Sequence, residues 1–212
     1  MSRCIVVALI LWLFLPSFAA WPLSPRQLDL FRLPSIQKQT LDLAEKALIA
    51  WTKTGKPYVP SQKEIEGDVF HAQSGVFVTL EKKGKLVGCR GTLSPARPYL
   101  YQEIVESALA AASRDPRFQP LRSSDLPGIR MIVTIVGEAM NLSDFSGHDP
   151  LIFGLCARSG DKAGVMLPGE APSTDKQMAW CRKRAGIIAE PVTWIRFTGI
   201  RFSRILKERD LS

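Results

Sequence analysis

The feature that most constrains the fold is a β-hairpin signal followed directly by an amphipathic helix. Residues 76–80 (VFVTL) are β-branched, aromatic or apolar, and residues 86–93 return after a turn in EKKGK that contains Gly84. Apolar side chains then recur at helical spacing over residues 101–112, and Pro116 ends the pattern. A hairpin and a helix in this order predict a sheet with the helix packed against it.

The last third of the sequence repeats this combination. Residues 150–168 predict a second hairpin that turns at SGDKAG, and residues 173–187 predict a short helix whose N-cap is Ser173 or Thr174. Residues 191–206 alternate with a period of two, but neither face of the alternation is purely polar. This pattern predicts a final strand that is covered on both sides.

Two further segments complete the expected architecture. Apolar spacing predicts a helix over 36–52 that stops at TGKP, and residues 130–136 predict a long apolar strand. Because no regular βαβ alternation is present, we predict an α+β fold in which an antiparallel β-sheet is flanked by helices. The length of 212 residues suits one compact domain, or a domain with a small lobe attached.

The N-terminus differs in composition from the rest. It has a single arginine and no acidic residue before a short apolar run over 4–15, which small residues follow. A membrane span needs about 20 apolar residues. We therefore predict a secretory signal peptide over 1–19 and a periplasmic or secreted protein, with an uncleaved membrane anchor as the alternative. The proline-rich residues 20–35 predict an extended lead-in to a folded domain over 36–208.

The chain is basic, with 28 Lys and Arg against 20 Asp and Glu and a formal net charge of +8. This balance favours anionic partners such as nucleic acid or lipid. The basic residues are spread along the sequence, which favours a solvated basic surface. Export would argue against a nucleic-acid partner, because exported proteins rarely meet nucleic acid.

Removal of a signal peptide would leave three of the four cysteines, namely Cys89, Cys156 and Cys181. An odd number permits at most one internal disulfide, so the chain is not a disulfide scaffold. We consider one pairing, between Cys89 and Cys181, because both are retained in a chain with an export signal.

Familiar cofactor and metal motifs are absent from the sequence. It contains no GxGxxG after a strand, no phosphate-binding GxxxxGKS or GxxxxGKT and no CxxC pair. Its two histidines, His71 and His148, are far apart and form no HExxH-type pair. We therefore predict no cofactor and no metal site built by the protein.

Cys89 is the candidate nucleophile, and it stands between glycines in Gly88-Cys89-Arg90-Gly91. The glycines allow a backbone or a ligand to approach closely. A thiol becomes a useful nucleophile when a nearby cation lowers its pKa. Since adjacent residues of a strand point to opposite faces, Arg90 is expected to face away and leave the thiol without a cation. Two interpretations stay open: a small buried thiol, and a catalytic nucleophile.

The RDPRF segment after the helix predicted over 101–112 is a second candidate. Asp115 can accept backbone hydrogen bonds at the turn, Pro116 stops the helix and Phe118 can enter the core, which explains the segment structurally. A functional interpretation places Asp115 or Arg117 in a pocket beside the GCRG strand. The candidate cleft residues are therefore Gly88, Arg90, Gly91, Asp115 and Arg117.

The chain resembles the AMMECR family in four segments that occur in the same order: GVFVTLEKKGKLVGCRGTL, ALAAASRDPRFQPL, GVMLPGE and WCRKRAG. The resemblance covers residues 37–206. The family's strand motif is Leu-Arg-Gly-Cys-Ile-Gly; the cysteine and both glycines match, and the arginine has moved to position 90. On a regular strand the family arginine would share the face of the cysteine, where this sequence has Val87.

The resemblance implies a larger and a smaller lobe with a cleft between them. It implies no settled activity, since nucleotide or nucleic-acid binding and enzymatic work at the motif cysteine have both been suggested for such proteins. It also implies partners, a Memo-like protein and a radical S-adenosylmethionine protein. The export signal departs from this picture, because such partners are expected in the cytoplasm.

These observations favour a module that binds a ligand or partner, with a small molecule or a protein segment in the cleft and Cys89 in a structural role. One alternative is a thiol enzyme with Cys89 as nucleophile and Arg117 or Asp115 placing the substrate. A second alternative is a protein that binds nucleotides or nucleic acid through its basic surface.

Overall fold

The computed structural model describes residues 23–208, and the signal segment predicted over 1–19 lies outside them. The helices are α1 (Pro25–Asp29), α2 (Pro34–Thr54), α3 (Leu100–Ser113) and α4 (Thr174–Ala185). The strands are β1 (Val76–Lys82), β2 (Lys85–Gly91), β3 (Ile129–Asn141), β4 (Gly154–Ser159), β5 (Lys162–Met166) and β6 (Thr193–Ile205). Within this range no helix is both long and apolar enough to cross a membrane.

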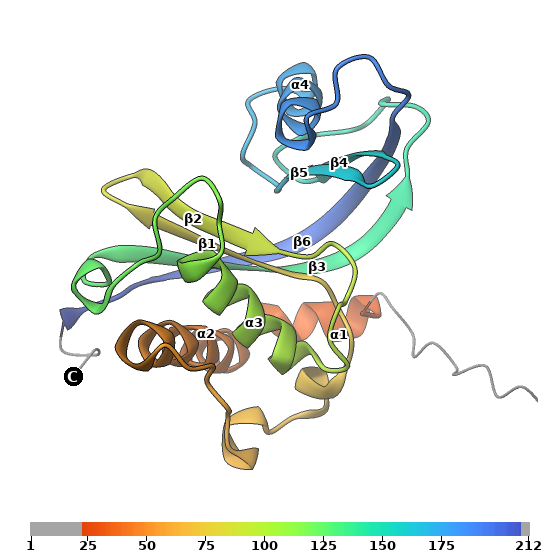
Figure 1. Ribbon diagram of the computed structural model, residues 1–212. Coiled ribbons are helices and arrows are strands. Elements are labelled where there is room, and N and C mark those ends of the chain that lie inside the picture. Colours follow the sequence, from red (N-terminus) through yellow and green to blue (C-terminus); the bar gives the residue numbers. More distant parts are fainter. Residues whose placement is uncertain (1–22, 209–212) are drawn as a thin grey trace, which may run out of the picture.

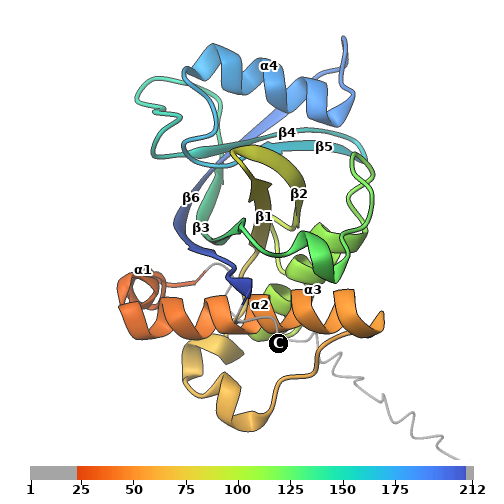
Figure 2. The ribbon, with the colours of Figure 1, turned by 90° about the vertical axis from the view of Figure 1, so that its left-hand side faces the viewer.

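All of these strands form one antiparallel sheet in the order β2-β1-β3-β6-β4-β5. β3 and β6 have 13 residues each and pair nearly end to end, with a bulge between Val136 and Ala139. The sheet curls around these two strands into a half-barrel, seen in Figure 2, with β2 and β5 as its two free edges. The predicted α+β fold with an antiparallel sheet flanked by helices is therefore confirmed.

In the larger lobe, α2 and α3 cover the outer face of the sheet formed by β1, β2 and β3 (Figure 1). The core between the layers includes Leu48 of α2, Ile104 of α3, Leu80 of β1 and Met131 of β3, which have no exposed surface. Burying one apolar face of each helix against the sheet is the main source of stability in such a layer. Both helices and the first hairpin match the predicted segments.

The smaller lobe consists of β4, β5 and α4, which pack at the end of β6 that begins at Thr193 (Figure 1). It has its own apolar core, which contains Leu155, Met166 and Cys181. The Ser173 hydroxyl caps α4 by accepting a hydrogen bond from the Lys176 N–H at 3.3 Å. The second hairpin and its helix were both predicted, and Ser173 is the N-cap.

The lead-in expected to be extended over 20–35 is partly helical among the described residues. Ser24 and Gln27 form a capping box, with the Gln27 N–H donating to the Ser24 hydroxyl, and Pro25 occupies the first turn of α1. Phe31 is fully buried in the main core. Proline-rich composition suggested an extended chain, but capping chemistry and the burial of one aromatic ring favour short helical turns instead.

Candidate functional site

The two free edges of the sheet line a common pocket of about 310 Å³. The larger lobe contributes residues 89–91 of β2 and residues 115–117 from the loop after α3. The smaller lobe contributes residues 163–165 of β5 and Arg184 of α4. The structure therefore brings together five of the six residues predicted for the site, and Gly88 is the exception.

Gly88 faces α3 instead of the pocket. A Cβ atom at this position would stand 2.1 Å from the Ala111 carbonyl oxygen, so the glycine lets α3 pack directly on β2. Arg90 lies at the rim, because it lines both the 310 Å³ pocket and a second pocket of about 470 Å³ against α3. Alternation does not separate Arg90 from Cys89 here, since a pocket at the edge of a sheet is open to both faces.

The Cys89 sulfur is partly buried and lies 3.2 Å from the Thr79 hydroxyl oxygen. Burial raises the pKa of the Cys89 thiol above its ordinary value, although the Thr79 hydrogen bond and the charges of Arg117 and Arg184 act in the opposite direction. The expectation that the thiol has no cationic neighbour is therefore wrong: its cations come from Arg117 and Arg184, which are distant in sequence. The net result is nevertheless a protonated thiol at neutral pH.

Neither histidine is placed to act as a base for this thiol. His148 is buried in the smaller lobe, where its Nε2 lies 2.7 Å from Gln177 Oε1, and His71 packs against Tyr99 and Tyr101. In residues 23–208 no group of three or more His, Cys, Asp or Glu side chains could hold a metal ion. An imidazole-activated thiolate therefore has no support in this site.

Asp115 clamps the edge of β2 to the loop after α3. Its Oδ2 accepts a hydrogen bond from the Cys89 N–H at 2.8 Å, and Arg117 donates to its carboxylate from Nε at 2.9 Å and from Nη2 at 2.7 Å. Although burial acts in the opposite direction, the hydrogen bonds from Arg117 and from the backbone of Cys89 and Arg117 lower the pKa of Asp115. The carboxylate therefore stays ionised and holds the half-exposed Arg117 side chain at the pocket.

A β-bulge in β2 changes which residue shares the face of Cys89. The pairing with β1 skips Val87, because Leu80 pairs with Gly88 while Glu81 pairs with Leu86. Val87 packs against the main core, and Leu86 lines the inner face of the sheet. The prediction that Val87 occupies the position beside Cys89 is therefore wrong, and regular alternation along the strand could not have revealed the bulge.

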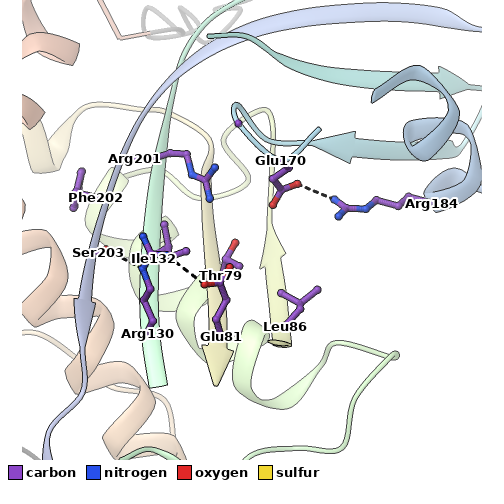
Figure 3. A pocket seen from close by; sticks show the side chains of 11 residues that line it. Thr79, Glu81, Leu86, Arg130, Ile132, Glu170, Arg184, Arg201, Phe202 and Ser203 are labelled. Carbon is purple, nitrogen blue, oxygen red and sulfur yellow. Dashed lines mark hydrogen bonds and ion pairs between the residues drawn. The ribbon is translucent and has the colours of Figure 1, made fainter. Parts of the chain in front are cut away.

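A larger pocket of about 510 Å³ adjoins the first on the inner, concave face of the sheet (Figure 3). It is lined by polar and charged side chains from β1, β3 and β6, and by Glu170 and Arg184 from the smaller lobe. Arg184 lines both pockets, which we together call the interlobe cleft. The other charged side chains in the larger pocket are Glu81, Arg130 and Arg201.

The arginines of the larger pocket differ in their partners. Arg130 Nη1 lies 3.5 Å from Glu81 Oε2, and Arg184 Nη1 lies 3.2 Å from Glu170 Oε2. Arg201 donates only to the Pro168 carbonyl oxygen, and no carboxylate of residues 23–208 lies within ion-pair distance of it. Figure 3 shows the Arg201 side chain pointing into the pocket. Among residues 23–208, the larger pocket therefore contains one guanidinium without a carboxylate partner, that of Arg201.

Sequence reasoning missed the charged residues of this larger pocket. β6 was predicted to be covered on both sides, but its inner face at Arg201 and Ser203 lines open space. In the sequence, Arg184 stands out only within the WCRKRAG segment, and Glu170 only at the end of the GVMLPGE segment. The mixed polarity of both faces of β6 was the one available signal, because a strand that lines a pocket keeps polar side chains on its inner face.

The remaining cysteines lie in the smaller lobe and are buried. Burial raises the pKa of Cys156 to about 11 and that of Cys181 to about 12. The Cys181 thiol donates to the Leu155 carbonyl oxygen at 3.1 Å. All three cysteines of the described chain are free, so the pairing of Cys89 with Cys181 is not present in the structure.

Comparisons with known proteins find matches over most of this chain. The family model described as AMMECR1 matches residues 41–202. A protein of Thermotoga maritima is 34% identical over 157 residues, which are 72% of this chain and 90% of the relative. A protein of Methanosarcina mazei is 31% identical over 169 residues, which are 75% of this chain and 83% of the relative.

A solved structure has a similar fold. The crystal structure of uncharacterized protein PH0010 from Pyrococcus horikoshii superposes with a TM-score of 0.63 at 22% sequence identity. The match covers 78% of this chain and 89% of that chain. The half-barrel with its two lobes is therefore an architecture that other proteins share.

Proposed function

This chain belongs to the AMMECR1 family, and we propose that it is a binding module whose interlobe cleft holds an anionic ligand. The observation that carries the proposal is Arg201, which points into the larger pocket and has no carboxylate partner among the described residues. A planar guanidinium with five N–H donors suits carboxylate and phosphate groups, which it can bind through two parallel hydrogen bonds.

The rest of the cleft supports the same class of ligand. Arg130 and Arg184 add N–H donors at the sides of the larger pocket, where Glu81 and Glu170 balance their charges, and the hydroxyl groups of Thr79 and Ser203 add neutral hydrogen-bonding groups. Volumes of about 510 Å³ and about 310 Å³ are in the range that small ligands occupy. Because the cleft lies between lobes, ligand atoms can contact both of them.

The state of the thiol favours binding over catalysis. The Cys89 pKa is raised and neither imidazole lies near the sulfur, so the site lacks the group that most often activates a thiol as a nucleophile. A thiol enzyme is the alternative hypothesis.

Three further expectations belong to this proposal. We propose, from family resemblance, that the chain acts with a Memo-like protein and a radical S-adenosylmethionine protein. We propose export, from the composition of residues 1–19. Co-purification of the three proteins from one compartment would test both ideas together, because a cytoplasmic complex would contradict export.

The binding proposal is tested by calorimetric titration of the purified chain with phosphate, pyrophosphate, succinate and citrate. We expect at least one of these anions to bind saturably and to bind more weakly as ionic strength rises. The Arg201→Gln variant should lose most of this affinity, whereas Arg26→Gln, a change of an exposed arginine on α1, should leave it unchanged. Equal affinity in Arg201→Gln and the unaltered chain would contradict the proposal, and so would the absence of binding by every anion.

A further inference from the structure

The edge of β2 turns main-chain groups toward the smaller pocket. The Thr92 N–H donates to the Val76 carbonyl oxygen of β1 at 3.0 Å, so the main-chain N–H and C=O of Thr92 point toward β1. In an antiparallel ladder the N–H and C=O of one residue point to the same side, and the next residue points to the other. The main-chain groups of Gly91 and Cys89 therefore point outward, away from β1 and into the free edge, in agreement with the hydrogen bond from the Cys89 N–H to Asp115.

The edge of β5, in the smaller lobe, also turns main-chain groups toward this pocket. Arg184 Nη1 donates to the Val165 carbonyl oxygen at 2.6 Å, so this carbonyl is not used by the ladder with β4. The main-chain groups of Val165 and, by alternation, those of Ala163 therefore point outward, away from β4. We call the outward main-chain groups of Cys89, Gly91, Ala163 and Val165 the seam, and all four residues line the same 310 Å³ pocket.

Charged side chains already occupy part of the seam. Asp115 accepts from the Cys89 N–H, Arg117 Nη2 lies 3.4 Å from the Cys89 carbonyl oxygen, and Arg184 holds the Val165 carbonyl. The N–H groups of Gly91, Ala163 and Val165 have no hydrogen-bond partner within residues 23–208. Free strand edges of this kind are ready to pair with an added strand unless something blocks them.

We propose that the ligand of the cleft is an extended acidic peptide segment of a partner protein, which enters the seam as a β-strand and pairs with the main chain of Gly91 and Val165. The inference rests on the proposed function, because it names the class of that anionic ligand. Main-chain pairing at an edge gives affinity, and side-chain pockets on alternate residues give specificity.

Charge complementarity selects an acidic segment. Arg90, Arg117 and Arg184 line the pocket at the seam; Arg117 is paired with Asp115 and Arg184 with Glu170, so Arg90 adds a positive charge that no carboxylate of residues 23–208 pairs with. Arg184 also lines the larger pocket, so an acidic side chain of the bound segment can extend toward Arg201. The segment therefore carries a carboxylate next to a residue that pairs with the seam.

The first test selects random linear peptides, displayed on phage, for binding to the immobilised full chain. We expect the enriched peptides to be acidic and β-prone, and a synthetic copy to bind with an affinity that falls as salt is raised. Enrichment of neutral or basic peptides, or no enrichment, would overturn the inference. If small anions still bind through Arg201 in that case, the proposed function stands and only the peptide class is wrong.

The second test separates main-chain pairing from charge attraction. N-methylation of the amides of the selected peptide keeps its charge but removes its main-chain donors, and we expect it to weaken binding by about tenfold or more. Hydrogen exchange at the Gly91 or Val165 amide should slow when the peptide binds. Equal binding of the methylated peptide, or unchanged exchange at both amides, would overturn the inference.

A matched pair of variants locates the seam on β5. Ala163→Pro removes one outward N–H without breaking the ladder to β4, whereas Ala163→Ser keeps that N–H. We expect weaker peptide binding only in the proline variant, with unchanged thermal unfolding in both. A dimer of the chain that the peptide does not dissociate, detected by light scattering, would instead identify a second copy as the occupant and overturn the inference.

Discussion

The outer and inner faces of the same strands differ in what they contribute to the molecule. The outer face carries buried apolar side chains against α2 and α3: Val76, Val78 and Leu80 of β1, Met131, Val133 and Ile135 of β3, and Ile200 and Phe202 of β6. The inner face carries the side chains that line the larger pocket, among them Thr79, Glu81, Arg130, Arg201 and Ser203. Because neighbours on a strand point to opposite faces, each strand contributes to the core on one side and to the lining of the pocket on the other.

The largest expected effect comes from the outer face. Leu80 has no exposed surface, so Leu80→Ala should lower the free energy of unfolding by about 2–5 kcal/mol through lost burial and the cavity that remains. Urea denaturation monitored by circular dichroism measures this loss. Ser203→Ala on the exposed inner face is the control and should change stability by no more than about 0.5 kcal/mol. Equal losses of unfolding free energy in the two variants would contradict the different roles of the outer and inner faces.

An intermediate effect is expected where the two faces meet, at the Asp115 clamp. Asp115→Asn weakens the pairing with Arg117 and the bond from the Cys89 N–H, and it should lower stability by about 1–3 kcal/mol. The folded pKa of Asp115 is depressed, so the unfolded chain takes up this proton first as pH falls. Its contribution is therefore present above the unfolded pKa of about 3.9 and is lost as pH falls through the lower folded value.

The acid dependence is measured by urea denaturation at a series of pH values. The unaltered chain should lose more stability on acidification than Asp115→Asn, because only the former has this carboxylate to protonate. Parallel pH profiles would show that the clamp contributes nothing and that the edge of β2 is held by the ladder alone.

The smallest effect concerns the reactivity of Cys89. Its raised pKa predicts slow alkylation by iodoacetamide at neutral pH, with a rate that rises only above the ordinary thiol value of about 8.5. Arg117→Gln removes a positive charge near the sulfur and should slow the reaction further, while Arg26→Gln should not. Mass spectrometry of the labelled, folded chain identifies the modified cysteine. Reaction faster than that of a free cysteine would favour the thiol enzyme.

The sequence was a good guide to the elements of the fold. Apolar spacing predicted α2, α3 and both hairpins, and the N-cap of α4 was one of two residues named. It was less reliable for the lead-in, where α1 replaced an extended chain, and for β3, which extends to Asn141 because it continues to pair with β6. Pairing with a distant strand cannot be read from local composition.

The site was only partly predictable for the same reason. One of the two interpretations of the DPRF segment placed it beside the GCRG strand, and the two segments do lie side by side, since the Asp115 carboxylate binds the Cys89 N–H. The Val87 bulge was missed, because a bulge depends on the register against β1. The expected absence of a cation near the thiol was wrong, because Arg184 approaches Cys89 from the other lobe.

Spacing along the chain was thus sufficient to identify the helices, the hairpins and the α+β class, because helix and strand periods are set by local backbone geometry. The gathering of Arg184, Glu170 and Arg201 into one cleft, and the meeting of the β2 and β5 edges, required the folded half-barrel. Such contacts join residues far apart in sequence, and their geometry depends on how the whole sheet twists and curls.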